Sequence, residues 1–154
     1  MELQLVINKP PTPKQSFKMG NGHGYLDSRT KSYMDIVTQQ VMTQLPGDFV
    51  IIREPIEMQI EHHFPYTNDM LKLIKKNNYA GDGIVPRLIK TTRPDVTDNL
   101  NKGLIDAMNG WVFIDDALIW RFSASKMYAE VPRSIVRIKT SETLLIDKNS
   151  LFEL

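Results

Sequence analysis

The sequence contains no cysteine. Disulfides, thiolate metal ligands and a cysteine nucleophile are therefore excluded, and any bound metal must be held by oxygen or imidazole. No apolar run approaches the ~20 residues that a transmembrane helix needs. Residues 1–7 also lack the apolar stretch behind a basic start that marks a signal peptide. From these absences we expect a cytoplasmic protein without a membrane partner.

A strong net charge is also missing, because 19 basic residues are balanced by 18 acidic ones and the formal charge is only +1. A nucleic-acid partner must therefore be argued from where the charges lie, not from their sum. Basic residues gather in residues 9–31 and 120–139. Such stripes attract a DNA duplex, although either stripe by itself is better explained as solvated surface.

At 154 residues, 42% hydrophobic and 24% charged, the chain has the size and composition of one globular domain, 1–154. Strict alternation of apolar and polar residues in 56–64 predicts a strand with one solvent-exposed face, with His62 on the core side and His63 on the solvent side. Residues 65–92 form a basic excursion that fits a short helix at 68–76, and 141–154 form a C-terminal tail. The other expected elements are a helix that starts at a Ser28 cap and ends at Pro46–Gly47, a second helix at about 98–108, an apolar segment at 111–114, and strands at 3–7, 118–127 and 134–139. This order predicts an α/β (α+β) fold, a small mixed sheet packed with two main helices.

The segment that starts at Arg93 contains the charged residues from which we predict a catalytic site. At 100° per residue, Asp98, Lys102 and Asp106 follow one side of the second helix at intervals of four, opposite its apolar side. Asp95 lies either one turn earlier or on the incoming loop, and both placements let it converge with Asp98. Helix-terminal carboxylates and an i, i+4 ion pair also have a purely structural explanation.

A second acidic group shifts the balance towards function. Asp115 and Asp116 stand between the apolar runs 111–114 and 117–120, where adjacent carboxylates are costly unless they are paired or bound to metal. Hard cations such as Mg²⁺ prefer a few carboxylates and leave room for a substrate phosphate. Lys102 would complement the phosphate charge. The pattern therefore indicates a metal site for phosphoryl chemistry.

The order Arg93-Pro-Asp95, Asp98-Asn-Leu-Asn-Lys102, Asp106-Ala-Met-Asn-Gly110 and Asp115-Asp116-Ala resembles the signature of RusA-type Holliday junction resolvases of phages and prophages. The resemblance is strong over about 27 residues. It extends to the N-terminal part through the Pro10–Lys14 loop, residues 21–25 and the helix that follows.

This resemblance implies a Mg²⁺- or Mn²⁺-dependent endodeoxyribonuclease that resolves Holliday junctions and other branched DNA by paired nicks. Asp95, Asp98 and Asp116 would bind the metal and act with Lys102 in catalysis, and Asp115 is the less certain neighbour. Arg93 would contact the junction, and we expect Lys14, Lys18 and Lys31 to contribute to DNA binding. The resemblance also implies a homodimer, whose two-fold axis presents one site to each of two equivalent strands. The expected setting is the cytoplasm of a bacterial host.

The spacing of the first two aspartates differs from the family's pattern, and alternative functions therefore stay open. The family has one residue between the first two aspartates, whereas this sequence has Val96 and Thr97. The extra residue is either absorbed as a bulge or helical turn, or it displaces Asp95 and weakens the site. A module that binds branched or single-stranded DNA with weak or no nuclease activity is therefore one alternative, and a metal-dependent nuclease without junction preference is another.

Overall fold

A computed structural model describes residues 1–14, 18–20, 23–25, 27–77, 88–97 and 99–141, with only the backbone described at 18–20 and 23–25. Within these ranges the chain forms seven strands, three α-helices and one 3-10 helix. In chain order they are β1 (Glu2–Ile7), β2 (Lys18–Gly20), β3 (His23–Tyr25), α1 (Ser28–Gln44), β4 (Ile56–Pro65), α2 (Asn68–Lys76), β5 (Leu88–Ile89), α3 (Asn99–Met108), η1 (Asp116–Leu118), β6 (Ile119–Ala129) and β7 (Arg133–Thr140).

Five of the strands form one mixed sheet in the order β1-β7-β4-β6-β5. β4 lies at its centre, antiparallel to β7 and parallel to β6, and the outer pairs β1–β7 and β5–β6 are antiparallel. Parallel neighbours need a long crossover, and the chain between β4 and β6 supplies it through α2, β5 and α3. The predicted α+β fold with a small mixed sheet is confirmed.

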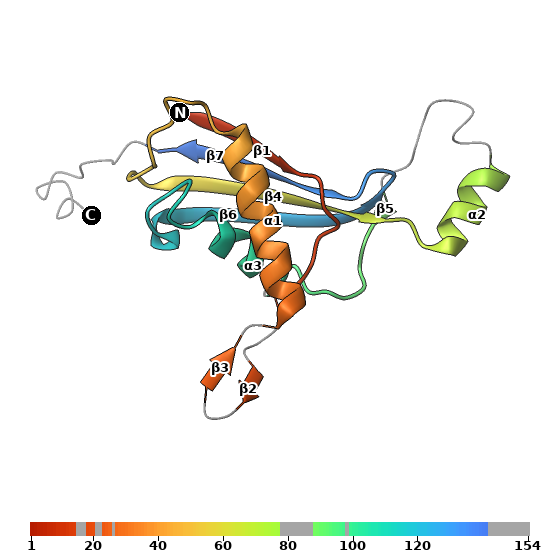
Figure 1. Ribbon diagram of the computed structural model, residues 1–154. Helices are drawn as coiled ribbons and strands as arrows, with labels where there is room; N and C mark the ends of the chain where they lie inside the picture. Colours follow the sequence, from red (N-terminus) through yellow and green to blue (C-terminus); the bar gives the residue numbers. More distant parts are fainter. Residues whose placement is uncertain (15–17, 21–22, 26, 78–87, 98, 142–154) are drawn as a thin grey trace, which may run out of the picture.

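The core lies between one face of this sheet and the helices α1 and α3 (Figure 1). The alternation along β4 buries Ile56, Met58 and Ile60 on that face. The two helices also contact each other, since the Thr38 hydroxyl of α1 donates to the Ala107 carbonyl of α3 at 3.0 Å. α3 is therefore held by both the sheet and α1. The opposite face of the sheet carries polar side chains instead.

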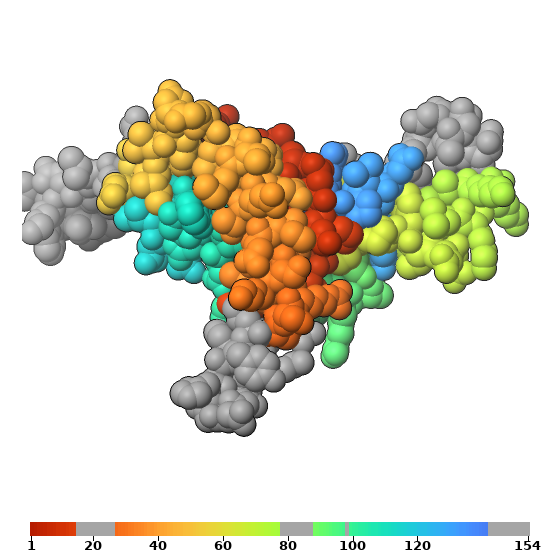
Figure 2. Space-filling model, viewed as in Figure 1, coloured from red at the N-terminus to blue at the C-terminus, as the bar shows by residue number. Residues whose placement is uncertain are grey.

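The three helices occupy different surroundings. α1 runs across the front of the molecule, whereas α2 extends from one end of it (Figure 2). The α1 cap is Asp27 and not Ser28, because the Asp27 carboxylate accepts from the Arg29 and Thr30 amides at 2.9 and 3.2 Å. Among the described residues, none of the helices combines the length and apolar character needed to span a bilayer.

One further expectation was wrong, and one element was missed. The His63 ring lies 3.6 Å from the Glu61 carboxylate, and it is only 1% exposed although we expected it to face solvent. The apolar segment 111–114 makes only isolated bridges through Phe113. The β2–β3 hairpin in the early loop was missed, although the Asn21-Gly22 dipeptide between the two strands is a sequence signal for a hairpin. Long-range packing decides the burial of His63, since alternation alone does not reveal what covers a sheet face.

Candidate active site

Helix α3 presents one buried and one exposed side at the candidate site. Leu100, Leu104 and Met108 are fully buried, while Lys102 is exposed on the opposite side. The predicted division of this helix into an apolar and a polar side is confirmed. Asp98, which precedes the first helical residue, lies outside the described residues.

Asp116 reaches the site on the short helix η1, directly before β6. The buried residues Val112 and Phe113 anchor the incoming chain, because the Ile52 amide donates to the Val112 carbonyl at 2.9 Å and the Gly110 amide to the Phe113 carbonyl at 2.8 Å. Gly110 adopts φ +79°, a conformation that suits glycine. The chain then emerges at the surface with both adjacent aspartates exposed.

A cavity of about 290 Å³ brings Lys102 and Asp116 together. Its walls come from the segment before α3, from α3 itself, from η1 and from β6. The lining residues are Thr97, Asn101, Lys102, Ile105, Asp106, Asp116 and Phe122. Two of the predicted site residues, distant in sequence, therefore share one hollow. Asp95 is exposed on the incoming segment and is not part of the lining.

The charges at this site differ in whether they are already paired. The Lys14 ammonium forms an ion pair with Asp106, and the Asp115 carboxylate accepts from the Ala117 amide at 2.8 Å as the cap of η1. In contrast, the charged groups of Asp95, Lys102 and Asp116 make no hydrogen bond or ion pair with any described residue. They are available for a ligand that brings its own charges.

The donor set suits a hard divalent cation, which prefers carboxylate oxygens and tolerates water in its remaining positions. Asp95 and Asp116 offer such oxygens without a competing ion pair in the described ranges. No three histidine or acidic side chains among those ranges are grouped so as to hold a metal. The predicted third aspartate, Asp98, lies outside them. The described residues therefore include two of the three predicted ligands, Asp95 and Asp116, whose carboxylates suit the chemistry of such a cation.

Comparison with known proteins identifies the family. The model of the family described as endodeoxyribonuclease RusA matches residues 8–139. The chain belongs to the RusA family. It is also similar to the uncharacterized protein YqaN of Bacillus subtilis (strain 168), with 31% identity over 127 residues, which covers 82% of this chain and 85% of YqaN.

Membership of the RusA family confirms the resemblance inferred from the sequence, and it implies endodeoxyribonuclease activity on Holliday junctions. The match covers every segment that lines the cavity, from Thr97 before α3 to Phe122 of β6. The cavity therefore lies within the part of the chain that the family model matches. Neither comparison names a metal or assigns a role to a residue.

The basic residues predicted to bind DNA in this RusA-family chain have different surroundings. Arg93 and Lys31 are exposed, before α3 and on α1 respectively. Lys14 is half-buried against α3, where its amide donates to the Asn99 carbonyl at 2.9 Å in addition to the ion pair with Asp106. The Lys18 side chain lies outside the described part of the chain. Contact of these four residues with DNA stays a prediction.

Sequence reasoning missed several residues that shape the RusA-family site. Thr97, Phe122 and Asn101 line the cavity, and Asn101 is only 4% exposed. Asn101 had a detectable signal, because it lies three residues before Leu104 and thus on the buried side of the helix. A polar side chain at such a position needs a partner. Phe122 had no such sequence signal, since its place beside α3 follows from the sheet register.

Proposed function

We propose that this chain is a divalent-metal-dependent endodeoxyribonuclease that resolves Holliday junctions and other branched DNA by paired nicks. The cavity shared by Lys102 and Asp116 supports this proposal most directly, because both charged groups lack a partner among the described residues. A phosphodiester and a divalent cation together would complement a lysine and a set of carboxylates. Family membership supports the choice of DNA as substrate.

The roles follow from the chemistry of the side chains. Asp95, Asp98 and Asp116 would hold Mg²⁺ or Mn²⁺, with Asp115 as an additional ligand beyond its capping bond. When bound, the cation supplies Lewis-acid polarisation of the scissile phosphate and offsets its negative charge. Lys102 donates hydrogen bonds to the phosphoryl oxygens and stabilises the charge that develops there. Asp95, Asp98, Lys102 and Asp116 are thus the proposed catalytic residues.

DNA binding and symmetry complete the proposal. Arg93, Lys14, Lys18 and Lys31 contact backbone phosphates, which position the substrate without reading its sequence. A homodimer of this single-domain chain places two equivalent sites on a four-way junction, so that two strands are nicked in a paired manner. The biological setting we infer is recombination, repair or phage DNA processing in the cytoplasm of a bacterial host.

A cleavage panel tests the proposal. The purified chain is incubated with a labelled four-way junction, a duplex of the same sequence and a single strand, each with Mg²⁺, Mn²⁺ or EDTA. We expect paired nicks in the junction only, with either cation and not with EDTA. Sedimentation of the free protein and of its junction complex should give a dimer in both cases.

Each other outcome has a defined meaning. If the protein binds the junction but cleaves no substrate under any of these conditions, the enzyme assignment is contradicted and a DNA-binding module is the remaining assignment. Equal cleavage of duplex and junction would remove the junction preference but keep the nuclease. Cleavage that persists in EDTA would contradict the metal requirement.

A further inference from the structure

A line of polar groups crosses the core beside the candidate site. His62 lies on the core face of β4 and is 0% exposed. Its ring bridges two elements, because Nδ1 lies 2.9 Å from the Ser134 hydroxyl of β7 and Nε2 lies 2.8 Å from Oδ1 of Asn101 in α3. Buried polar groups are costly unless each has a partner, so this arrangement is tightly constrained.

The direction of these hydrogen bonds follows from Asn101. Its Nδ2 group donates to the Val96 carbonyl, so its Oδ1 faces His62 as an acceptor. Nε2 of His62 therefore carries the proton, and Nδ1 accepts from the Ser134 hydroxyl. Burial lowers the pKa of His62 to about 4, which keeps the ring neutral at neutral pH. The bonds run in one direction, from Ser134 through His62 and Asn101 to the Val96 carbonyl.

A second side chain holds the same segment from the sheet. The Lys126 ammonium of β6 donates to the carbonyls of Thr92 and Pro94 at 2.7 and 2.6 Å. The residues on both sides of Asp95 therefore have a carbonyl fixed by a side-chain donor, Pro94 by Lys126 and Val96 by Asn101. Asp95 itself is exposed and belongs to no helix or strand. Its backbone is thus held at two neighbouring points although the segment has no regular structure.

We infer that Asn101 and Lys126 are positioning residues that fix the backbone of Asp95 for cation binding, with His62 orienting the Asn101 amide. This inference rests on the proposed function, since it takes Asp95 as a ligand. The two-residue spacer Val96–Thr97 gives the chain between Asp95 and Asp98 freedom to place Asp95 elsewhere. A bond to the Val96 carbonyl removes part of that freedom before the cation arrives. Outer groups that orient ligands in this way commonly change metal affinity by about 10- to 100-fold.

Two variants and a matched control test the inference in the full-length protein. Asn101→Leu keeps the branched shape of the side chain and removes its hydrogen bonds to Val96 and His62. Lys126→Met removes the ammonium that donates to the Thr92 and Pro94 carbonyls. Ser134→Ala removes a buried hydrogen bond from the same line but leaves the Asn101 and Lys126 bonds in place. The measurements are the Kd of Mn²⁺ by calorimetry, the Tm, and amide hydrogen exchange in peptides that cover residues 92–97.

We expect Asn101→Leu and Lys126→Met to weaken Mn²⁺ binding by about 10-fold or more and to speed exchange in residues 92–97. In junction cleavage, kcat should fall while KM changes less than about twofold, because the substrate contacts are untouched. Ser134→Ala should lower the Tm without changing the Mn²⁺ affinity. A purely structural network would instead lower the Tm in all three variants without a selective loss of metal affinity.

The inference is overturned if Asn101→Leu and Lys126→Met bind Mn²⁺ like the wild type, or if Ser134→Ala loses as much affinity as they do. Lys126→Met remains decisive if Asn101→Leu does not fold, because Lys126 lies at the edge of the core and not within it. A wild-type protein that neither binds Mn²⁺ nor cleaves would contradict the proposed function itself. Even in that case, amide hydrogen exchange in residues 92–97 that is unchanged in Asn101→Leu and Lys126→Met would overturn the positioning role of Asn101 and Lys126.

Discussion

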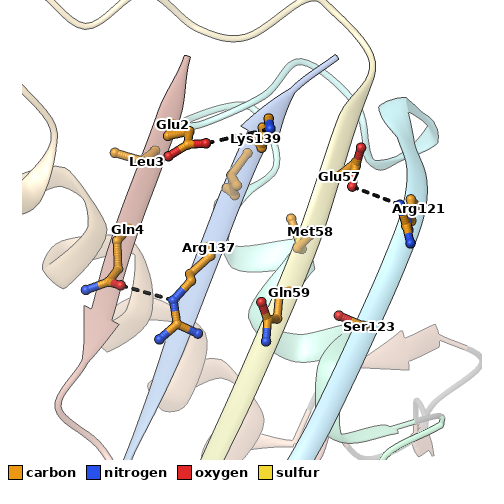
Figure 3. A pocket seen from close by; sticks show the side chains of 11 residues that line it. Glu2, Leu3, Gln4, Glu57, Met58, Gln59, Arg121, Ser123, Arg137 and Lys139 are labelled. Carbon is orange, nitrogen blue, oxygen red and sulfur yellow. Dashed lines mark hydrogen bonds and ion pairs between the residues drawn. The ribbon is translucent and has the colours of Figure 1, made fainter.

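Charged residues on the two sides of the sheet differ in whether they are already paired with one another. On the open face, the acidic and basic side chains are already paired across strands (Figure 3). Glu2 lies 3.8 Å from Lys139, and Glu57 lies 3.5 Å from Arg121. Glu61 pairs with Arg137, which also donates to Gln4. At the cavity beside α3, in contrast, Lys102 and Asp116 have no partner among the described residues.

This difference shows which charges are available for a ligand. The open face also has a hollow, of about 630 Å³, which is larger than the cavity beside α3. Its charged groups neutralise one another, so a charged ligand would have to break existing pairs. Size alone would favour the open face as the ligand site. We place the proposed site at the smaller cavity because Lys102 and Asp116 have no partner among the described residues.

The largest expected effect on the cleavage rate separates two acid-to-amide substitutions, one at the cavity and one on the open face. Asp116→Asn should reduce cleavage of a four-way junction by about 10³-fold or more, because a metal ligand supplies several kcal/mol of transition-state stabilisation. Glu57→Gln, on the paired face, should leave the rate within about twofold of the wild type. Single-turnover cleavage measures both, and a gel-shift assay should show that junction binding is retained. Normal cleavage by Asp116→Asn would remove this residue from the site.

A smaller effect is expected for the basic residues of the two sides. Lys102→Met should lower kcat by about 10²-fold, which is the usual consequence of losing one donor to a developing negative charge. Lys139→Met keeps the same hydrophobic stem on the paired face and should change kcat by less than about twofold. Steady-state cleavage with saturating junction separates the two. Equal losses in both variants would indicate a general effect of positive charge and not a specific role of Lys102.

The smallest effect concerns stability on the paired face. Hydrogen bonding from Arg137 holds the pKa of Glu61 below its ordinary value of 4.5. The folded state therefore favours the ionised form, and this contribution is complete above pH 4.5 and is lost as the pH falls through the lower folded-state pKa. Glu61→Gln should cost at most about 1 kcal/mol at pH 7, because the partly exposed pair is screened by solvent.

Urea unfolding as a function of pH tests this last prediction. The difference in unfolding free energy between wild type and Glu61→Gln should narrow as the pH is lowered below 4.5. Cleavage activity should be unchanged, since Glu61 does not line the cavity beside α3. A difference that grows on acidification would contradict the assigned direction of the pKa shift.

Much of the fold was predictable because its signals are local. The alternation of β4 predicted a strand at 56–64 and the structure forms Ile56–Pro65, and α2 was predicted with its observed bounds, Asn68–Lys76. The periodicity of α3 placed Leu104 in the core and Lys102 at the surface. Segments without such periodicity were harder. Residues 111–114 have the composition of a strand but form only isolated bridges through Phe113, with Ile52 and Asn109.

Local patterns were enough to predict the family, the order of the main elements and the residues proposed for catalysis, because spacing along one helix and along one chain segment is a local property. Only the tertiary structure decided which charges are already paired, since Glu57 and Arg121 meet through the register of two parallel strands. It likewise decided that His62 meets Asn101, 39 residues away. Such contacts depend on how the sheet and α3 pack, which no local pattern encodes.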